Sequence, residues 1–451
     1  MIQKFEPYVY QDRMLEWAEE RRSFGYLVSC GMGKTVTTLK VIENRMIDGQ
    51  TRGALIVAPV RVCSVTWPNQ IAQWEHSSWM RVAHLRTPEG IKAWHDGSAD
   101  IYLVNPEQLP KLVPLMFKGK KRIPVDTVIF DELSLAKNPT SKRFNALRPY
   151  LPDYFKERIG LTGSPVPNNY LDLFAQIRLL DDGKRLGRSF HQYRQQWFTS
   201  DFMGYTWTIN PGAKEIIDAK IADLCLVMLG DDYLDLPTCN TEDISVTLPP
   251  EAKAQYKELE KELLLELEKS DVVALNAATL SNKLLQLTGG SIYGEDRIVN
   301  HVHDAKLDAL VKLRKKHKKE PMLVLTAFKH ESARVLKAIK GAVMFHEDLI
   351  PAWQRGEIHT FVADPRSLSH GIDGLQVGGR IAVWFTLTWS HETYLQTNAR
   401  LVRTGQSYET IIYRLVCSGT IDDAVCCALK NKSDTQSGLL HALKALQILA
   451  K

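Results

Sequence analysis

A glycine-rich stretch near the start of the chain has the residue types that bind phosphate. Residues 28–35 read VSCGMGKT, after an apolar segment and before a helical pattern. Gly31 and Gly33 allow a tight turn whose backbone N–H groups point at phosphate oxygens where a helix begins. Lys34 supplies a charge for the β- and γ-phosphates, and the Thr35 hydroxyl can ligate Mg²⁺. The stretch predicts a phosphate loop, although its first residue is valine where the strict pattern has glycine.

Two carboxylates, Asp131 and Glu132, follow an apolar strand-like run over residues 125–130. In a nucleotide-binding parallel sheet the ligand lies beyond the carboxyl ends of the strands. There Asp131 can hold Mg²⁺, and Glu132 can orient and deprotonate an attacking water. Two acids at a strand end are ordinarily solvated surface groups. Because a phosphate loop precedes them in the chain, we predict a catalytic role.

Two arginines and a glutamine are further candidates, each with an ordinary alternative. Arg400 and Arg403 lie three residues apart, and this spacing predicts one helical face. An arginine delivered to a transferring phosphate is worth about 10³–10⁵ in rate, whereas two isolated arginines are usually surface charges. Gln11 precedes the phosphate loop, and its amide can read an adenine edge, or it can simply begin a helix.

Composition favours a globular protein with two large lobes. The chain has 451 residues, of which 44% are hydrophobic and 24% charged, and its net charge of +5 leans mildly toward polyanions. None of the seven cysteines forms a C-x-x-C pair, so neither a zinc site nor a disulfide framework is indicated. No apolar run is long enough to span a membrane, and the N-terminus lacks a signal pattern. We expect a cytoplasmic protein, in a bacterial host's cytoplasm if viral, with no membrane partner.

Strand and helix patterns alternate twice along the chain. Apolar strand-like runs occupy residues 54–58, 101–104, 125–130 and 158–162, and then 322–326, 342–345, 358–363, 381–385 and 410–416. Such alternation predicts an α/β fold of two tandem lobes, each a parallel sheet flanked by helices. We place lobe 1 at residues 1–240, with an aromatic-rich, irregular insertion over about 181–240. Lobe 2 takes residues 241–451 and begins with a helical insertion over about 250–290.

Two weak hairpin signals lie outside the strands that carry the motifs. One covers residues 202–208, and the other pairs residues 291–293 with 297–299 around a glycine-containing turn. A rigid hairpin with an aromatic residue at its tip could separate DNA strands by stacking on an exposed base. Simple coverage of apolar faces is the alternative for each. We favour the second hairpin, because Tyr293 and Arg297 flank its turn and a basic run follows.

Taken in order, five motifs resemble those of a known family. GMGKT, FDEL, LTGSPVPN, SHGIDGLQ and QTNARLVRTGQ resemble the motif series of superfamily-two helicases, and the last is the form found in Swi/Snf-like ATPases. The resemblance spans about residues 5–430 and points to a compact phage or bacterial type. It implies two RecA-like lobes with ATP and Mg²⁺ in the interlobe cleft and DNA crossing both lobes.

The resemblance also implies residue roles. ATP would be bound by Gln11, Gly31, Met32, Gly33, Lys34, Thr35 and Asp373, and Mg²⁺ by Thr35 and Asp131. The catalytic residues would be Lys34, Asp131, Glu132, Arg400 and Arg403. Thr162, Ser164 and Gln396 would couple hydrolysis to DNA, and the looser DNA-contact positions are Pro59, Arg61, Asn105, Phe328, Lys329, Ser369 and His370.

The sequence departs from the family at two points. Residues 29–32 read SCGM instead of an acidic stretch, and Leu133 and Ser134 follow the carboxylates where a histidine is often found. Every catalytic position is nevertheless filled, which disfavours a silent DNA-binding module. The length leaves no room for an appended reader domain beside two lobes, so a nucleosome remodeller is not expected.

These observations predict an ATP-dependent DNA translocase or helicase that remodels duplex or branched DNA, such as forks and junctions, in replication, recombination or repair. The alternative is a DNA-tracking motor that displaces bound proteins or serves a restriction complex. We expect a monomer that binds DNA independently of sequence and more weakly as salt increases.

Overall fold

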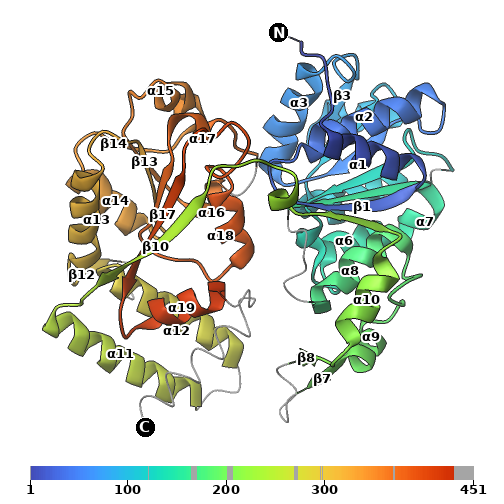
Figure 1. Ribbon diagram of the computed structural model, residues 1–451. Helices are drawn as coiled ribbons and strands as arrows, with labels where there is room; N and C mark the ends of the chain where they lie inside the picture. Colours follow the sequence, from blue (N-terminus) through green and yellow to red (C-terminus); the bar gives the residue numbers. More distant parts are fainter. Residues whose placement is uncertain are drawn as a thin grey trace. The chain divides into compact units, whose positions relative to one another are not determined.

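The computed structural model describes residues 2–119, 121–163, 170–200, 207–268, 273–294, 296, 298–368 and 371–430 (Figure 1). The chain divides into two compact units, Met1–Leu234 and Asp235–Lys451, where we had placed the boundary after residue 240. Each unit is an α/β layer structure, so the predicted fold class of two tandem helix-flanked parallel sheets is confirmed. Within the described residues, no helix is both long and apolar enough to cross a membrane.

Unit 1 is built on a seven-stranded parallel sheet. Its strands are β1 (Ser23–Val28), β2 (Ala54–Val57), β3 (Val82–His84), β4 (Ile101–Val104), β5 (Thr127–Asp131), β6 (Glu157–Thr162) and β9 (Cys225–Met228), in the order β3-β4-β2-β5-β6-β1-β9. Most of these strands are continuous apolar runs because helices cover both faces of the sheet. The order brings the carboxyl ends of β1 and β5 to the same edge, with β6 between them.

The helices of unit 1 pack on both sides of this sheet. They are α1 (Val9–Glu19), α2 (Lys34–Ile47), α3 (Trp67–Gln73), α4 (Pro88–Asp96), α5 (Leu109–Phe117), α6 (Lys142–Leu147), α7 (Leu151–Tyr154), α8 (Tyr170–Asp181), α9 (Phe190–Trp197) and α10 (Ala213–Ile221), with short helical turns at Val62–Thr66 (η1), Pro106–Gln108 (η2), Leu133–Ala136 (η3), Arg148–Tyr150 (η4) and Gly230–Asp232 (η5). Figure 1 shows α1, α2 and α3 on one face and α6 and α8 on the other. Successive strand side chains enter opposite cores: Leu55 and Val57 pack on the α6–α8 side, and Ala54 and Ile56 on the α1–α3 side.

The segment that we expected to be irregular is largely ordered. It holds α9, α10 and the antiparallel strands β7 (Phe198–Ser200) and β8 (Trp207–Ile209), and then β9, which pairs with β1 at the edge of the main sheet. The expectation was wrong, since residues 225–228 read CLVM, an apolar run as long as β2, and they form this edge strand. Most of the predicted hairpin at residues 202–208 lies outside the described residues.

Unit 2 has a six-stranded parallel sheet. Its strands are β10 (Cys239–Val246), β13 (Met322–Leu325), β14 (Ala342–Met344), β15 (Thr360–Ala363), β16 (Ile381–Trp384) and β17 (Thr410–Cys417), in the order β10-β17-β16-β13-β15-β14. Its helices are α11 (Pro250–Glu268), α12 (Val273–Thr288), α13 (Ala305–Lys316), α14 (Lys329–Ala338), α15 (Ile350–Gln354), α16 (Pro365–Leu368), α17 (Leu375–Gly378), α18 (His391–Asn398) and α19 (Ile421–Lys430), with a turn at Glu347–Leu349 (η6). Figure 1 shows the edge strand β10 lying along β17.

The second predicted hairpin exists in a shifted register. β11 (Ser291–Tyr293) pairs with β12 (Val299–His301), and Tyr293 lies opposite Val299. We had expected residues 297–299 to form the second strand. The turn is therefore longer than predicted, because its sequence lacks the Asn-Gly or Asp-Gly pair that fixes a two-residue loop.

Candidate nucleotide site

The predicted phosphate loop lies between β1 and α2. Gly31 and Gly33 have φ values of 86° and 72°, which belong to the left-handed region that glycine enters without strain. α2 begins at Lys34, directly after the loop, so its first N–H groups face the end of β1. A strand, a glycine turn and a helix N-terminus together make the anion-binding geometry that the sequence predicted.

Lys34 folds back onto its own loop. Its Nζ donates to the backbone carbonyls of Val28 at 2.7 Å and Ser29 at 3.0 Å. The side chain is partly buried. The two carbonyls accept hydrogen bonds from the ammonium group and hold it at the loop, where a bound phosphate would be its charged partner.

Gln11 lies against the phosphate loop. The side chain is only 4% exposed; its Oε1 accepts from the Tyr8 amide at 3.0 Å, and its Nε2 lies 3.4 Å from the Met32 carbonyl. A side chain at position 33 would collide with the Gln11 amide. Gln11 therefore does help to begin α1, which was the alternative to a nucleotide-binding role. It also lies next to the phosphate loop, where a residue that reads adenine is expected.

Asp131 ends β5 and is held by a tryptophan. The Trp67 indole Nε1 donates to Asp131 Oδ2 at 2.8 Å. Burial raises the pKa of Asp131, while this hydrogen bond and the charge of Lys34 act in the opposite direction. Asp131 forms no ion pair with any described residue, so a cation bound beside it would relieve the cost of its burial. Sequence reasoning missed Trp67, because nothing in its local pattern marks it as the partner of a strand-end carboxylate.

Glu132 is oriented by two hydroxyls. Its Oε1 accepts from Thr162 Oγ1 at 2.9 Å and from Ser134 Oγ at 3.0 Å, and its backbone is left-handed with φ of 74°. Burial and then the neighbouring charge of Asp131 raise its pKa. The Glu132–Thr162 bond links the strand-end carboxylates to the third motif on β6, although Ser164 of that motif lies outside the described residues.

The donor set fits Mg²⁺ held largely by water and phosphate. Mg²⁺ typically takes one or two protein oxygens and keeps several waters. The Asp131 carboxylate and the Thr35 hydroxyl in the first turn of α2 are oxygen donors of this kind. No group of three or more histidine, cysteine, aspartate or glutamate side chains in the described part is placed to hold a metal ion. The residues therefore suit a magnesium–nucleotide complex better than a metal cage built from protein alone.

Trp67→Phe should weaken the response to Mg²⁺. Losing the indole donor leaves Asp131 without its hydrogen bond, and such supporting contacts typically contribute 10–100-fold in metal affinity or activity. We expect the Mg²⁺ concentration for half-maximal ATP hydrolysis to rise about tenfold. The control is Trp79→Phe, because Trp79 is half-exposed and donates to the His76 carbonyl, away from Asp131. Equal Mg²⁺ curves for the two variants would contradict the role of Trp67.

In unit 2, both arginines of the last motif, QTNARLVRTGQ, converge on the preceding motif, SHGIDGLQ. Arg400 Nη1 and Arg403 Nη1 lie 2.8 Å and 3.3 Å from the Ile372 carbonyl, and Arg403 also pairs with Asp373 at 3.3 Å. The predicted common helical face was wrong: α18 ends at Asn398, and the arginines lie in the turns that follow. Arg403 Nε is buried with no partner among the described residues, so it remains available to an anion.

The remaining predicted positions are scattered over the two units. Gln396 is buried on α18 and donates to Glu392; Pro59 and Arg61 follow β2, and Asn105 follows β4, where its amide donates to Glu107. Phe328 precedes α14, and Lys329 begins it with an exposed side chain. Ser369 and His370 lie outside the described residues. Cys30 was also missed: its sulfur lies 4.0 Å from the Gly163 carbonyl, which brings the phosphate loop and the third motif together.

Comparison with known proteins gives consistent matches. The SNF2-related domain matches residues 10–304. "Putative protein p41" of Acyrthosiphon pisum secondary endosymbiont phage 1 is 32% identical and covers 98% of this chain and 100% of its own length. The DNA repair and recombination protein RDH54 of Saccharomyces cerevisiae is 23% identical over 84% of this chain, which spans only 44% of the yeast protein. A solved Sulfolobus solfataricus SWI2/SNF2 ATPase core in complex with dsDNA aligns over 94% of this chain and 92% of its own, with 19% identity and a TM-score of 0.46.

Proposed function

Because this chain belongs to the SNF2-related family, we propose that it is an ATP-driven DNA translocase that remodels duplex or branched DNA. The observation that carries this proposal is the edge of the unit 1 sheet. There a glycine loop with its lysine, a strand-end aspartate and a glutamate oriented by Thr162 occur in the family's motif order. A phosphate cradle, a metal-binding acid and a water-orienting acid are what ATP hydrolysis requires.

Mg²⁺ when bound would neutralise charge on the transferring phosphate. This chain's residues would do the rest. The loop amides and Lys34 bind the phosphates, Asp131 and Thr35 hold the metal, and Glu132 accepts the proton of the attacking water. The raised pKa of Glu132 suits that role, because a stronger base takes a proton more readily.

ATPase rates with different DNAs test the proposal. We expect single-stranded, duplex, forked and four-way-junction DNA to differ, with duplex or branched DNA stimulating hydrolysis most and without sequence preference. Increasing salt should weaken DNA binding steeply, since phosphate contacts release counterions. Hydrolysis that no DNA stimulates would contradict a translocase. If junction DNA stimulates ATP hydrolysis no more than duplex DNA does, the result would favour a motor that tracks along DNA and displaces proteins.

The β11–β12 hairpin is the best candidate for the element that separates strands. Arg334 of α14 binds the hairpin at both ends: it donates to the Gly289 carbonyl at 2.6 Å before β11 and to the His303 carbonyl at 2.7 Å after β12. Tyr293 packs edge-on against His330, at 5.0 Å between ring centroids. The hairpin is thus fixed to the helix that begins at Lys329, a predicted DNA contact. With Tyr293 packed against His330, the exposed apolar side chains that could meet a base pair are Ile298, 60% exposed, and Val299, 43% exposed.

Shortening this hairpin should uncouple unwinding from hydrolysis. Replacing residues 294–298 by Asn-Gly keeps the Tyr293–Val299 pair and closes it with a favoured two-residue turn. We expect DNA-stimulated ATPase to stay within about twofold while unwinding of forked and four-way DNA is lost, because the shortened turn removes Ile298 and the rest of the tip that would stand between the two strands. Ile298→Val, which retains a branched apolar tip, is the control. Junction processing at the normal rate by the shortened protein would exclude this hairpin as the wedge.

A further inference from the structure

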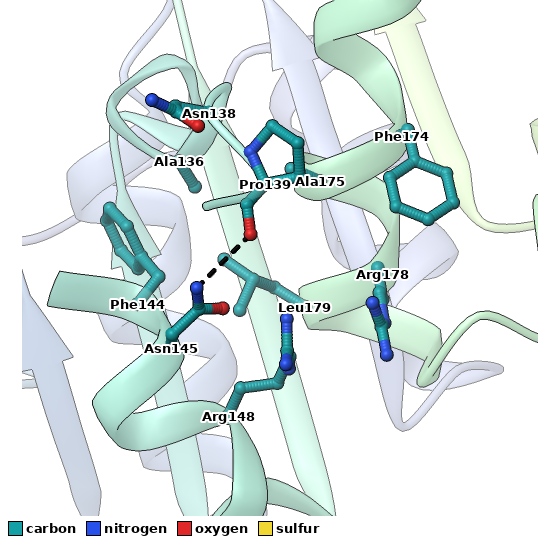
Figure 2. Close-up of a pocket in the computed structure, with 10 residues that line it drawn as sticks. All are labelled: Ala136, Asn138, Pro139, Phe144, Asn145, Arg148, Phe174, Ala175, Arg178 and Leu179. Carbon is teal, nitrogen blue, oxygen red and sulfur yellow. Dashed lines mark hydrogen bonds between the residues drawn. The ribbon is translucent and has the colours of Figure 1, made fainter. Parts of the chain in front are cut away.

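An open pocket in unit 1 lies between α6 and α8, away from the phosphate loop (Figure 2). Its lining is mixed: the apolar part includes Phe144, Phe174 and Leu179, and the polar part includes Asn138 and Asn145. Arg148, at the start of η4, and Arg178, on α8, both line this pocket (Figure 2), and the charge of Arg148 acts on Arg178. No carboxylate is among the residues that line the pocket.

These two arginines differ from their neighbours in having no carboxylate partner. Arg143 pairs with Glu107 at 3.0 Å, Arg158 with Asp182 at 2.7 Å, and Arg185 with Asp223 at 2.7 Å. Within the described part of the chain, the side chains of Arg148 and Arg178 have no hydrogen bond or ion pair, and the Arg178 guanidinium lies 5.9 Å from the centroid of the Phe174 ring. Two nearby, partly buried cations without an ion-paired carboxylate repel one another in the free protein, and an anion between them would offset that repulsion.

Electrostatics around Arg178 agree with this description. Burial lowers the pKa of Arg178, and the nearby charges of Arg148 and Arg188 lower it further, with Asp182 acting in the opposite direction. Residues 133–150, which form one wall, include four basic residues and no aspartate or glutamate. A patch of this charge attracts polyanions.

The pocket's form indicates which anion it would take. Guanidinium forks match the oxygens of a phosphate in a bidentate geometry. The pocket is small and open: its volume for the centres of water-sized molecules is about 20 Å³, far below that of sites that enclose a small molecule. It is therefore suited to one phosphate presented at the surface, as a nucleic-acid backbone does.

We propose that Arg148 and Arg178 bind a backbone phosphate of DNA and so form a second DNA contact on the α6–α8 face of unit 1. None of the motif positions carried over from the family lies in this pocket. The inference extends the proposed DNA function by a contact that holds a further segment of the duplex, or a second arm of a branched substrate.

Salt-dependent DNA affinity, measured without ATP, tests the contact. In Arg148→Ala/Arg178→Ala we expect duplex affinity to fall roughly tenfold or more at low salt. The slope of log affinity against log salt should decrease by about 1, the value for one phosphate. Arg81→Ala/Arg355→Ala is the control: it removes two positive charges from arginines outside residues 133–150 that already have carboxylate partners. Equal affinities and slopes for the two double variants would overturn the proposal.

A phosphate-binding measurement and a single substitution cover the remaining outcomes. If the variant binds DNA like the wild type but loses a saturable ³¹P signal with inorganic phosphate, the site takes a free anion and the proposal is wrong. If the double variant does not fold, Arg148→Gln alone should still lower both affinity and slope, because Arg148 makes no described contact that folding needs. A wild-type protein that binds DNA but never hydrolyses ATP would refute the proposed function and leave this test unaffected.

Discussion

The Lys34→Ala protein should hydrolyse no measurable ATP and should fold normally. The ammonium of Lys34 is the one charge that the loop places beside its own carbonyls, and phosphate affinity depends on it. Because the side chain is only partly buried, its removal opens no core cavity. Losing the two bonds to Val28 and Ser29 should cost about 1–3 kcal/mol of unfolding free energy at most.

The measurements are phosphate release, nucleotide binding by fluorescence and thermal unfolding. Lys40→Ala is a matched control, since Lys40 lies on the same helix and pairs with Glu43 instead of the loop. Wild-type turnover in Lys34→Ala would refute the phosphate loop. Loss of turnover together with an unfolded protein would leave a structural role for Lys34 as the explanation.

Arg400→Ala and Arg403→Ala should each lower the hydrolysis rate by about 10³-fold or more, the range found for arginines that contact a transferring phosphate. Nucleotide binding should weaken far less, because such a contact is strongest in the transition state. The orphaned Nε of Arg403 and the carbonyl that both arginines share suggest a preformed pair awaiting an anion.

The two effects are separated by comparing single-turnover rates with nucleotide dissociation constants. Arg355→Ala is the control, since Arg355 is exposed and pairs with Glu357. Equal losses in binding and rate would instead identify the arginines as ground-state ligands. A large drop in unfolding temperature would indicate that their bonds to Ile372 serve mainly the fold.

The central strands and the motif order could be predicted from sequence because each has a local signal. Residues 54–57 and 101–104 are apolar runs bounded by turns, and the structure makes them β2 and β4. The phosphate loop and Asp131 follow such strands directly, so predicting the strands also placed these residues at one edge.

What could not be predicted depends on contacts between distant residues. Trp67 reaches Asp131 across 64 positions, and Arg334 binds a hairpin more than 30 positions earlier. The arginines were assigned to a helix from spacing alone, yet α18 ends at Asn398 and a glycine with positive φ, Gly405, closes the following turns. β10 is largely exposed and polar, CNTEDISV, so only its pairing with β17 makes it a strand.

That pairing has a consequence for how the chain folds during synthesis. β10 is the first strand of unit 2 to be synthesised, yet its only neighbour among the described strands is β17. Asp243 on β10 can bind Arg414 only after the chain has grown by another 171 residues. At about 5–20 residues per second, the ribosome needs roughly 10–30 s to supply that partner. The buried pair of Lys306 and Asp422 is likewise completed only when α19 emerges. Unit 1 can therefore close while unit 2 is still open, and truncation before residue 410 should leave a folded first half attached to an aggregation-prone second half.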